Sequence, residues 1–244
     1  MSTPLPFLAF DIEIASDLPE DRPWQESAPL GITCASICYG SLSHTYHEEQ
    51  MADGRLAPQM SKKVCVAMLD ELVQAADSGS IIVGWNSLGF DLQVLGYETG
   101  EWDAIRELAR YQHVDPAFQM LCERGYMVGL NTAAQAMNVG HKLEGVKGAL
   151  APQMWRGSRE GQDLVLKYVE QDAVITHDLY AMIVENGLMN WRTRKGKLST
   201  WSPQMEPSRL LFVDECLELA LPDTSWMDSP RPRSQYAGWL EEST

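Results

Sequence analysis

Residues 7–14 read Phe7-Leu8-Ala9-Phe10-Asp11-Ile12-Glu13-Ile14. The aromatic and β-branched residues of this stretch predict a buried strand. Side chains alternate between the two faces of a strand, so Asp11 and Glu13 share one face and Ile12 points to the other. Two carboxylates in a buried strand are costly unless something compensates their charge, and a metal ion is one such partner. The alternative is a strand end at which both acids meet water.

Downstream of this strand, the pattern alternates between short strands and helices. Further strands are expected at residues 31–39, 43–47 and 80–85. Helices are expected at residues 61–76, 88–97, 102–111, 116–123, 132–137 and 161–186, with an irregular, glycine-containing connection at 140–158. Strands that come early, helices that come late and an alternation between them predict an α/β fold with a mixed sheet flanked by helices.

The C-terminal part of the chain has a different pattern. We expect one domain over residues 1–187, because Gly187 would end the long helix, and an extension over residues 188–244. The extension is expected to form a basic hairpin at 191–201, a helix at 208–220 and an extended or loose stretch at 222–234, which holds three prolines.

Charge and composition limit the function classes. The chain has 244 residues, with 19 lysines and arginines against 34 aspartates and glutamates, which gives a net charge of −15. This balance excludes a protein that holds duplex DNA on a broad basic face, but not an enzyme whose metal ions attract phosphate. Five scattered cysteines without a CxxC pair argue against a disulfide framework and a zinc site. Without a signal peptide or a long apolar run, we expect a cytoplasmic protein that does not bind membranes.

Two later segments carry acids at positions that suggest chemistry. Asp91 follows an apolar strand and a polar turn, which places it at the start of a helix, where an acid is also favoured by the helix dipole alone. Tyr168 and Asp172 are four residues apart on a helix and therefore lie on one face. The alternative is a core tyrosine beside a partly exposed aspartate.

The three segments together resemble a known family. In order, they are Phe10-Asp11-Ile12-Glu13, Asn86-Ser87-Leu88-Gly89-Phe90-Asp91 and Tyr168-Val169-Glu170-Gln171-Asp172. Their order and spacing resemble the DEDD-type 3′–5′ exonucleases, over about residues 7–187. The tyrosine branch is the closer match, since the histidine branch would have His where this chain has Lys167. The chain is similar to the exonuclease domain of family B DNA polymerases and to its stand-alone relatives.

This resemblance implies an RNase H-like fold with two divalent cations, Mg²⁺ or Mn²⁺. It implies that the four acids Asp11, Glu13, Asp91 and Asp172 hold the ions, and that Tyr168 orients the attacking water. It also implies that Asn86 and Phe90 line the path of the terminal nucleotides, and that the backbone of Ile12 contacts the last one. Independently, oxygen-only ligands favour Mg²⁺ or Mn²⁺ over zinc, and two such ions suit phosphodiester hydrolysis.

Other candidate contacts are weaker. Arg192 lies in a basic stretch flanked by Trp191 and Trp201, which predicts either a site for single strands or a solvated hairpin whose tryptophans pack on the core. Lys142 precedes the long helix, and the resemblance places that connection near the substrate cleft. Asp115, next to His113, is interpreted as the cap of a helix beginning at Pro116 rather than as a metal ligand.

The sequence therefore predicts a metal-dependent 3′–5′ exonuclease that releases nucleoside monophosphates from single-stranded ends. DNA is favoured over RNA only by the polymerase resemblance, and RNA trimming of the RNase D type stays open. A non-catalytic nucleic-acid-binding or partner-binding module is a second hypothesis. A third is a nuclease subunit that needs a protein partner to present its substrate.

Overall fold

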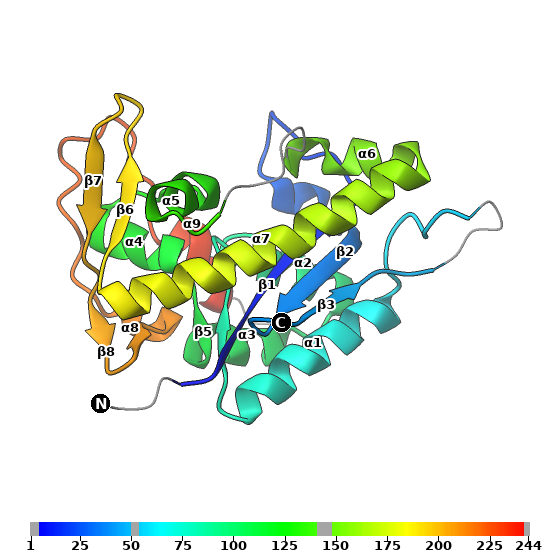
Figure 1. The fold of residues 1–244 in the computed structure, drawn as a ribbon, viewed down its shortest axis with the longest axis horizontal. Coiled ribbons are helices and arrows are strands. Elements are labelled where there is room, and N and C mark those ends of the chain that lie inside the picture. The colour runs from blue at the N-terminus through cyan, green and yellow to red at the C-terminus, as the bar shows by residue number, and fades with distance from the viewer. Residues whose placement is uncertain (1–4, 50–53, 141–147, 242–244) are drawn as a thin grey trace.

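A five-stranded mixed sheet forms the centre of the computed structural model, which describes residues 5–49, 54–140 and 148–241 (Figure 1). The strand order is β3-β2-β1-β4-β5, with β1 in the middle. β1 pairs antiparallel with β2 and parallel with β4. The strands are β1 (Phe7–Ile14), β2 (Ile32–Cys38), β3 (Ser43–Tyr46), β4 (Ile81–Val83) and β5 (His113–Val114). The α/β fold with a mixed sheet is confirmed.

Helices cover both faces of this sheet. The main helices are α1 (Lys62–Asp77), α2 (Asp91–Thr99), α3 (Trp102–Tyr111), α4 (Pro116–Arg124), α5 (Leu130–Met137), α6 (Ala151–Gly157) and α7 (Arg159–Asn186). Short 3₁₀ turns are η1 (Trp24–Ser27), η2 (Gly148–Leu150) and η3 (Gly238–Glu241). In Figure 1, the long α7 crosses one face of β1 and β2. None of the helices in the described ranges combines the length and apolar character needed to cross a bilayer.

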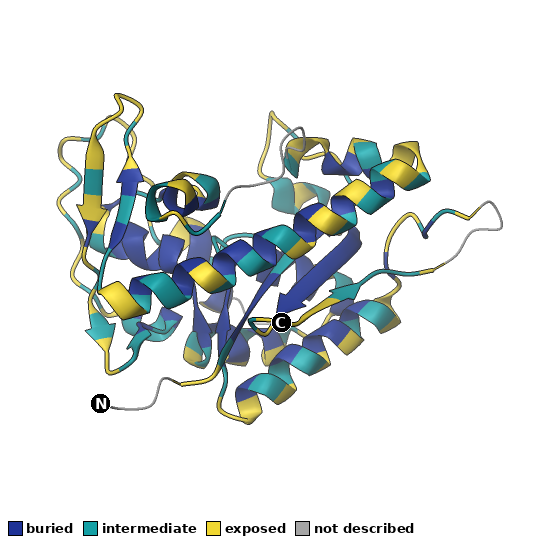
Figure 2. Ribbon diagram, in the orientation of Figure 1, coloured by how far each residue is buried: buried dark blue, intermediate teal, exposed yellow. Residues whose placement is uncertain are grey.

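The two faces of β1 enter different cores. Leu8, Phe10, Ile12 and Ile14 pack with the buried residues of α1, α2 and α3. Ala9, on the opposite face, packs with the buried residues of α7. Figure 2 shows β2 and most of β1 in the colour of buried residues. The predicted alternation of β1 is therefore confirmed, and the face that carries Asp11 and Glu13 is the one that α7 covers.

The ends of α7 follow from local chemistry. Ser158 caps the N-terminus, because its hydroxyl accepts a hydrogen bond from the amide of Gly161 at 3.2 Å. Gly187 ends the helix in the left-handed region, with φ of 64°. The predicted end at Gly187 is confirmed. Residues 148–158 were expected to be irregular, but they form η2 and α6, because Trp155 buries its ring and its indole donates to the Ala57 carbonyl at 2.9 Å.

The C-terminal extension packs into the same cores as the rest of the chain. Trp201 and Leu210 join the core under α7, and Tyr236, Trp239 and Leu240 join the core under α1–α3. The extension contains β6 (Met189–Arg192), β7 (Leu198–Trp201), β8 (Met205–Glu206), β9 (Arg209–Leu210), α8 (Val213–Leu217) and α9 (Ser234–Ala237). The predicted hairpin is confirmed, since β6 and β7 pair antiparallel.

The helix predicted at residues 208–220 is wrong. This segment instead forms β9 and the five-residue α8. The Arg209 guanidinium makes two hydrogen bonds to the Glu215 carboxylate, at 2.6 and 2.8 Å, and Glu215 also accepts from the Phe212 amide. These contacts hold a turn before α8, which a continuous helix would not allow. A sequence pattern of apolar spacing could not show this competing interaction.

Candidate functional site

The first part of the candidate site lies between β1 and α7. Asp11 and Glu13 sit on the face of β1 that α7 covers, and Tyr168 and Asp172 lie one turn apart on that helix. Glu13, Tyr168 and Asp172 are buried, with 7%, 3% and 3% of their surface exposed. The pairing of β1 with β2 is irregular next to Glu13, where a bulge shifts the register. Bulges of this kind often lie beside functional sites, where they redirect side chains.

The second part is the turn between β4 and α2, which runs from Asn86 to Asp91. Asn86 adopts φ of 61°, a conformation that asparagine tolerates better than most residues. The Asp115 carboxylate accepts from the amides of Asn86 at 2.9 Å and Leu88 at 3.1 Å. Asp115 also caps α4 by accepting from the Phe118 amide at 3.1 Å, as predicted. The same carboxylate therefore fixes the turn that leads to Asp91.

His113 also stabilises this turn through hydrogen bonds. Its Nε2 lies 2.9 Å from the Ser87 hydroxyl, and its Nδ1 lies 3.0 Å from the Ile82 carbonyl. Burial lowers the pKa of His113 from 6.5 to about 4, so the ring is neutral at pH 7. A carbonyl can only accept, so Nδ1 carries the proton and Nε2 accepts from Ser87. Burial also raises the pKa of Asp115 from 3.8 to about 6, against the backbone amides that favour its charged form.

A cavity of about 500 Å³ joins the three segments. Its lining includes all five predicted catalytic residues: Asp11, Glu13, Asp91, Tyr168 and Asp172. It also includes the three predicted nucleotide contacts Ile12, Asn86 and Phe90. The structure thus brings together eight of the ten residues that the sequence singled out, from segments far apart along the chain.

The donor chemistry of this cavity suits a hard divalent cation. Six acidic residues line it, the four predicted ligands together with Asp17 and Glu20, and carboxylate oxygens are the ligands that Mg²⁺ and Mn²⁺ prefer. Within the described ranges, however, no three His, Cys, Asp or Glu side chains are gathered into a formed metal-binding group. The residue types therefore fit divalent ions, while the side-chain positions do not yet form a coordination shell.

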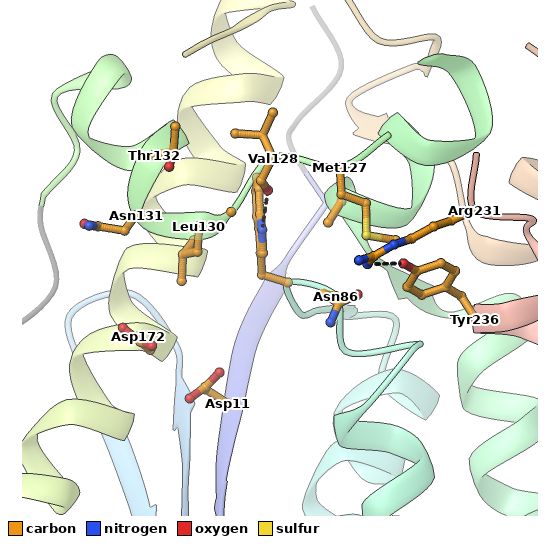
Figure 3. A pocket seen from close by; sticks show the side chains of 13 residues that line it. Asp11, Asn86, Met127, Val128, Leu130, Asn131, Thr132, Asp172, Arg231 and Tyr236 are labelled. Atoms are coloured by element: carbon orange, nitrogen blue, oxygen red, sulfur yellow. Dashed lines mark hydrogen bonds between the residues drawn. The ribbon is translucent and has the colours of Figure 1, made fainter. Parts of the chain in front are cut away.

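A second cavity, of about 480 Å³, adjoins the first and shares Asp11, Trp85, Asn86 and Asp172 with it. Figure 3 shows Asp11 and Asp172 on one side of this cavity and Arg231 with Tyr236 on the other. The Trp85 indole donates to the Val128 carbonyl at 3.0 Å, which fixes the ring between the two cavities.

Two predicted contacts remain. Lys142 is outside the described residues. Arg192 is an exposed residue at the end of β6, lines neither cavity, and has its guanidinium 3.4 Å from the Gly196 carbonyl. Trp191 and Trp201 are buried, and the Trp201 indole donates to Glu123 at 2.8 Å. Of the two interpretations of this hairpin, the structure has the one in which the tryptophans pack on the core.

The residues of the second cavity that were not predicted from the sequence include Trp85, Arg231 and Tyr236. Trp85 was expected only as the end of a strand, although an aromatic residue at the carboxyl end of a strand next to a polar turn was a usable signal. Arg231 and Tyr236 come from the extension, and no local pattern connects them with the distant acids. Their place could be found only from the tertiary fold.

Comparison with known proteins gives one family. No curated protein matches the chain. A family model described as the RNase H superfamily matches residues 37–184, which is more than half of the 244 residues. The match includes Asn86–Asp91 and the Tyr168–Asp172 helix, and it begins after Asp11 and Glu13. Together with the mixed sheet, this match shows that the chain belongs to the RNase H superfamily.

Proposed function

We propose that this protein is a divalent-metal-dependent 3′–5′ exonuclease of the tyrosine branch, which removes nucleoside monophosphates from single-stranded DNA. Membership of the RNase H superfamily indicates a nuclease that acts on nucleic acid, and such nucleases generally use divalent metals. The order of the three motifs supports the exonuclease class, and the similarity to polymerase proofreading domains favours DNA. Residues 1–187 form the catalytic domain in this proposal, with residues 188–244 as an extension that shares its core.

One observation carries the proposal: Asp11 and Glu13 of β1, Asp91 of α2, and Tyr168 and Asp172 of α7 line a single cavity. Two divalent ions held there by the four carboxylates would supply an activated water and would stabilise the leaving oxygen. The buried phenol of Tyr168 lies on the same helix face as Asp172, one turn away, where it can hydrogen bond a water or a phosphate oxygen.

The same cavity can admit the end of a strand. Phe90 is only partly buried and can offer its ring to a terminal base, while Asn86 can offer its amide. Ile12 lies between the two acids of β1 and can contact the last sugar through its backbone. With these residues beside the acids, we expect the end of a strand to occupy the cavity.

The test uses single-stranded DNA and RNA oligonucleotides labelled at the 5′ or the 3′ end, with Mn²⁺ or Mg²⁺. We expect a descending ladder from the 5′-labelled DNA and immediate release of a labelled mononucleotide from the 3′-labelled DNA. Asp172→Asn should abolish cleavage. Asp178→Asn is the matched control, because Asp178 lies on the same helix with its carboxylate exposed, and its activity should equal that of the wild type.

Several outcomes would contradict the proposal. A ladder from RNA alone would reassign the enzyme to RNA 3′-end trimming. Binding of oligonucleotides without cleavage under any metal would favour a non-catalytic module. Cleavage that survives Asp172→Asn would place the reaction outside this cavity. Activity that requires a cell extract would instead support a nuclease subunit that depends on a protein partner.

A further inference from the structure

One basic side chain is found among the described residues that line the second cavity, and it belongs to the C-terminal extension. Among the described residues that line either cavity, Arg231 is the one with a basic side chain, while Asp11 and Asp172 are shared between the cavities. In Figure 3, the guanidinium of Arg231 faces the interior of the cavity, opposite those two acids. A positive group at this place is notable in a chain with a net charge of −15.

The extension is fixed tightly against the turn that carries Asn86 and Asp91. The Trp239 indole donates to the Leu88 carbonyl at 3.0 Å. Gly89 lies so close to Tyr236 that a Cβ at this position would be 2.6 Å from the Tyr236 ring. Residues 222–234 were expected to be extended or loose, and residues 222–233 indeed form no helix or strand, while this packing on the C-terminal side of the segment holds its end in place. The position of Arg231 relative to the acids is therefore set by the fold.

Arg231 and Arg233 are two residues apart but have different surroundings. The Arg233 guanidinium donates to the carbonyls of Leu217, Leu219, Cys122 and Ala220, at 3.3, 2.6, 2.8 and 2.8 Å, so it has a structural role. Arg231 donates from Nη1 to the Tyr236 hydroxyl at 3.0 Å. No carboxylate pairs with Arg231 in the described part of the chain. With five N–H donors in its guanidinium, Arg231 keeps most of them for an anion.

The anion that belongs here follows from the geometry. A strand whose 3′ end lies in the carboxylate cavity must continue out of it, and the adjoining cavity shares Asp11, Asn86 and Asp172 with that site. Each further nucleotide brings one phosphate. A guanidinium binds phosphate through paired N–H donors, whereas the acids of the wall would repel an unpaired phosphate.

We propose that Arg231 binds a backbone phosphate of the substrate strand, upstream of the bond that is cleaved, and that the C-terminal extension thereby positions the strand. This inference rests on the proposed function. Tyr236 is a positioning residue, because its hydroxyl orients the Arg231 guanidinium. Arg231 does not touch the reacting phosphate in this arrangement, so it should matter for long substrates and not for short ones.

Substrate length provides the test. The p-nitrophenyl ester of thymidine 5′-monophosphate offers one nucleotide, which the carboxylate cavity alone can hold, whereas a 12-nucleotide oligothymidylate also fills the adjoining cavity. Loss of a charge-assisted phosphate contact should lower kcat/KM of Arg231→Gln for the oligonucleotide by about 10- to 100-fold. The rate on the nitrophenyl ester should stay within about twofold of the wild type. Arg231→Lys should restore part of the loss, since it keeps the charge and loses the paired geometry.

Binding measured without cleavage separates this inference from the proposed function. Fluorescence anisotropy of the labelled oligonucleotide, with Ca²⁺ in place of the reactive metal, should show weaker binding by Arg231→Gln. The slope of log K against log salt should fall by about 0.7, as expected for one phosphate on a single strand. The matched control is Arg124→Gln, which removes the same charge from an exposed arginine outside both cavities.

The outcomes are distinct. Wild-type protein that cleaves neither substrate would refute the proposed function and leave the binding arm as the test of Arg231. Equal losses on both substrates would overturn the inference, because they would place Arg231 in the chemistry or in the fold. Unchanged kcat/KM and salt slope in Arg231→Gln would also overturn it, as would an Arg124→Gln variant with the same reduced slope.

Discussion

A single added methyl group at Gly89 should test whether the C-terminal extension supports the candidate site. In Gly89→Ala, the new Cβ would lie 2.6 Å from Cδ1 of Tyr236 and 3.3 Å from Oδ1 of Asn86. Carbon atoms prefer separations of about 3.5–4.0 Å, so the ring or the turn must move by about 1 Å. The ring cannot move freely, because its hydroxyl accepts from Arg231 and the Tyr236 carbonyl accepts from the Trp239 indole.

The expected cost comes from overpacking. Inserting a methyl group into a packed region without space typically lowers the free energy of unfolding by about 1–3 kcal/mol. Tyr236→Ala alone should cost more, about 3–5 kcal/mol, because it removes a buried ring. In the Tyr236→Ala background the obstacle is absent, so adding Gly89→Ala should cost nothing further. The coupling energy between the two sites should therefore be about 1–3 kcal/mol.

Urea unfolding of the four proteins in this cycle measures the coupling. Gly157→Ala is the control substitution, since its Cβ would meet nothing within 4 Å, and it should leave stability unchanged or slightly raised. The opposite result is an equal loss of unfolding free energy from Gly89→Ala with and without the Tyr236 ring. That result would mean that the extension does not press on the turn in solution.

Three further predictions concern the site itself. Mn²⁺ at about a hundred times its Kd should raise the free energy of unfolding by about 2.7 kcal/mol. Thermal melts should show the corresponding rise in melting temperature for the wild type and not for Asp172→Asn. An unchanged rise in this variant would place the ions elsewhere. Tyr168→Phe should lower kcat on oligonucleotides by at least about tenfold while the Mn²⁺-induced shift remains, and wild-type kcat in this variant would remove Tyr168 from the mechanism. His113 has its pKa lowered from 6.5 to about 4, so its stabilising contribution is present above pH 6.5 and is lost as the pH falls to 4. In urea unfolding, the stability advantage of the wild type over His113→Gln should therefore shrink by about 3 kcal/mol from pH 7 to pH 4. A difference that stays constant with pH would contradict the burial of a neutral ring.

Strong periodic patterns explain which elements could be predicted from the sequence. β1 and α7 were predicted almost to their ends, because an apolar run interrupted only by Asp11 and Glu13 and a long helix with one apolar face leave little ambiguity. β5 was missed, since His113–Val114 is too short to show any period. α6 was missed because glycine and proline suggested a loop, whereas the burial of Trp155 favours a helix.

The residues of the candidate site also differ in whether they could be predicted from the sequence. Asp11, Glu13, Asp91, Tyr168 and Asp172 each lie on an element with a clear pattern, so their convergence could be inferred from the resemblance. Arg231 lies between two prolines in a segment without any period. Its place opposite the acids depends on packing such as that of Tyr236 on Gly89, which no local pattern shows. Residues contributed by irregular segments are therefore the part of a site that sequence reasoning finds last.

The strand β1 links the stability of this fold to its chemistry. Leu8, Phe10, Ile12 and Ile14 occupy one face and form part of the core, so the register of β1 is set by hydrophobic burial. Because the side-chain period is two, the same register fixes Asp11 and Glu13 on the face beneath α7. A slip of one residue would bury both carboxylates among the apolar side chains of the other face, where an unpaired charge is costly. The burial energy of the apolar face thus holds the two like charges on one face beneath α7, where a divalent cation would relieve their repulsion.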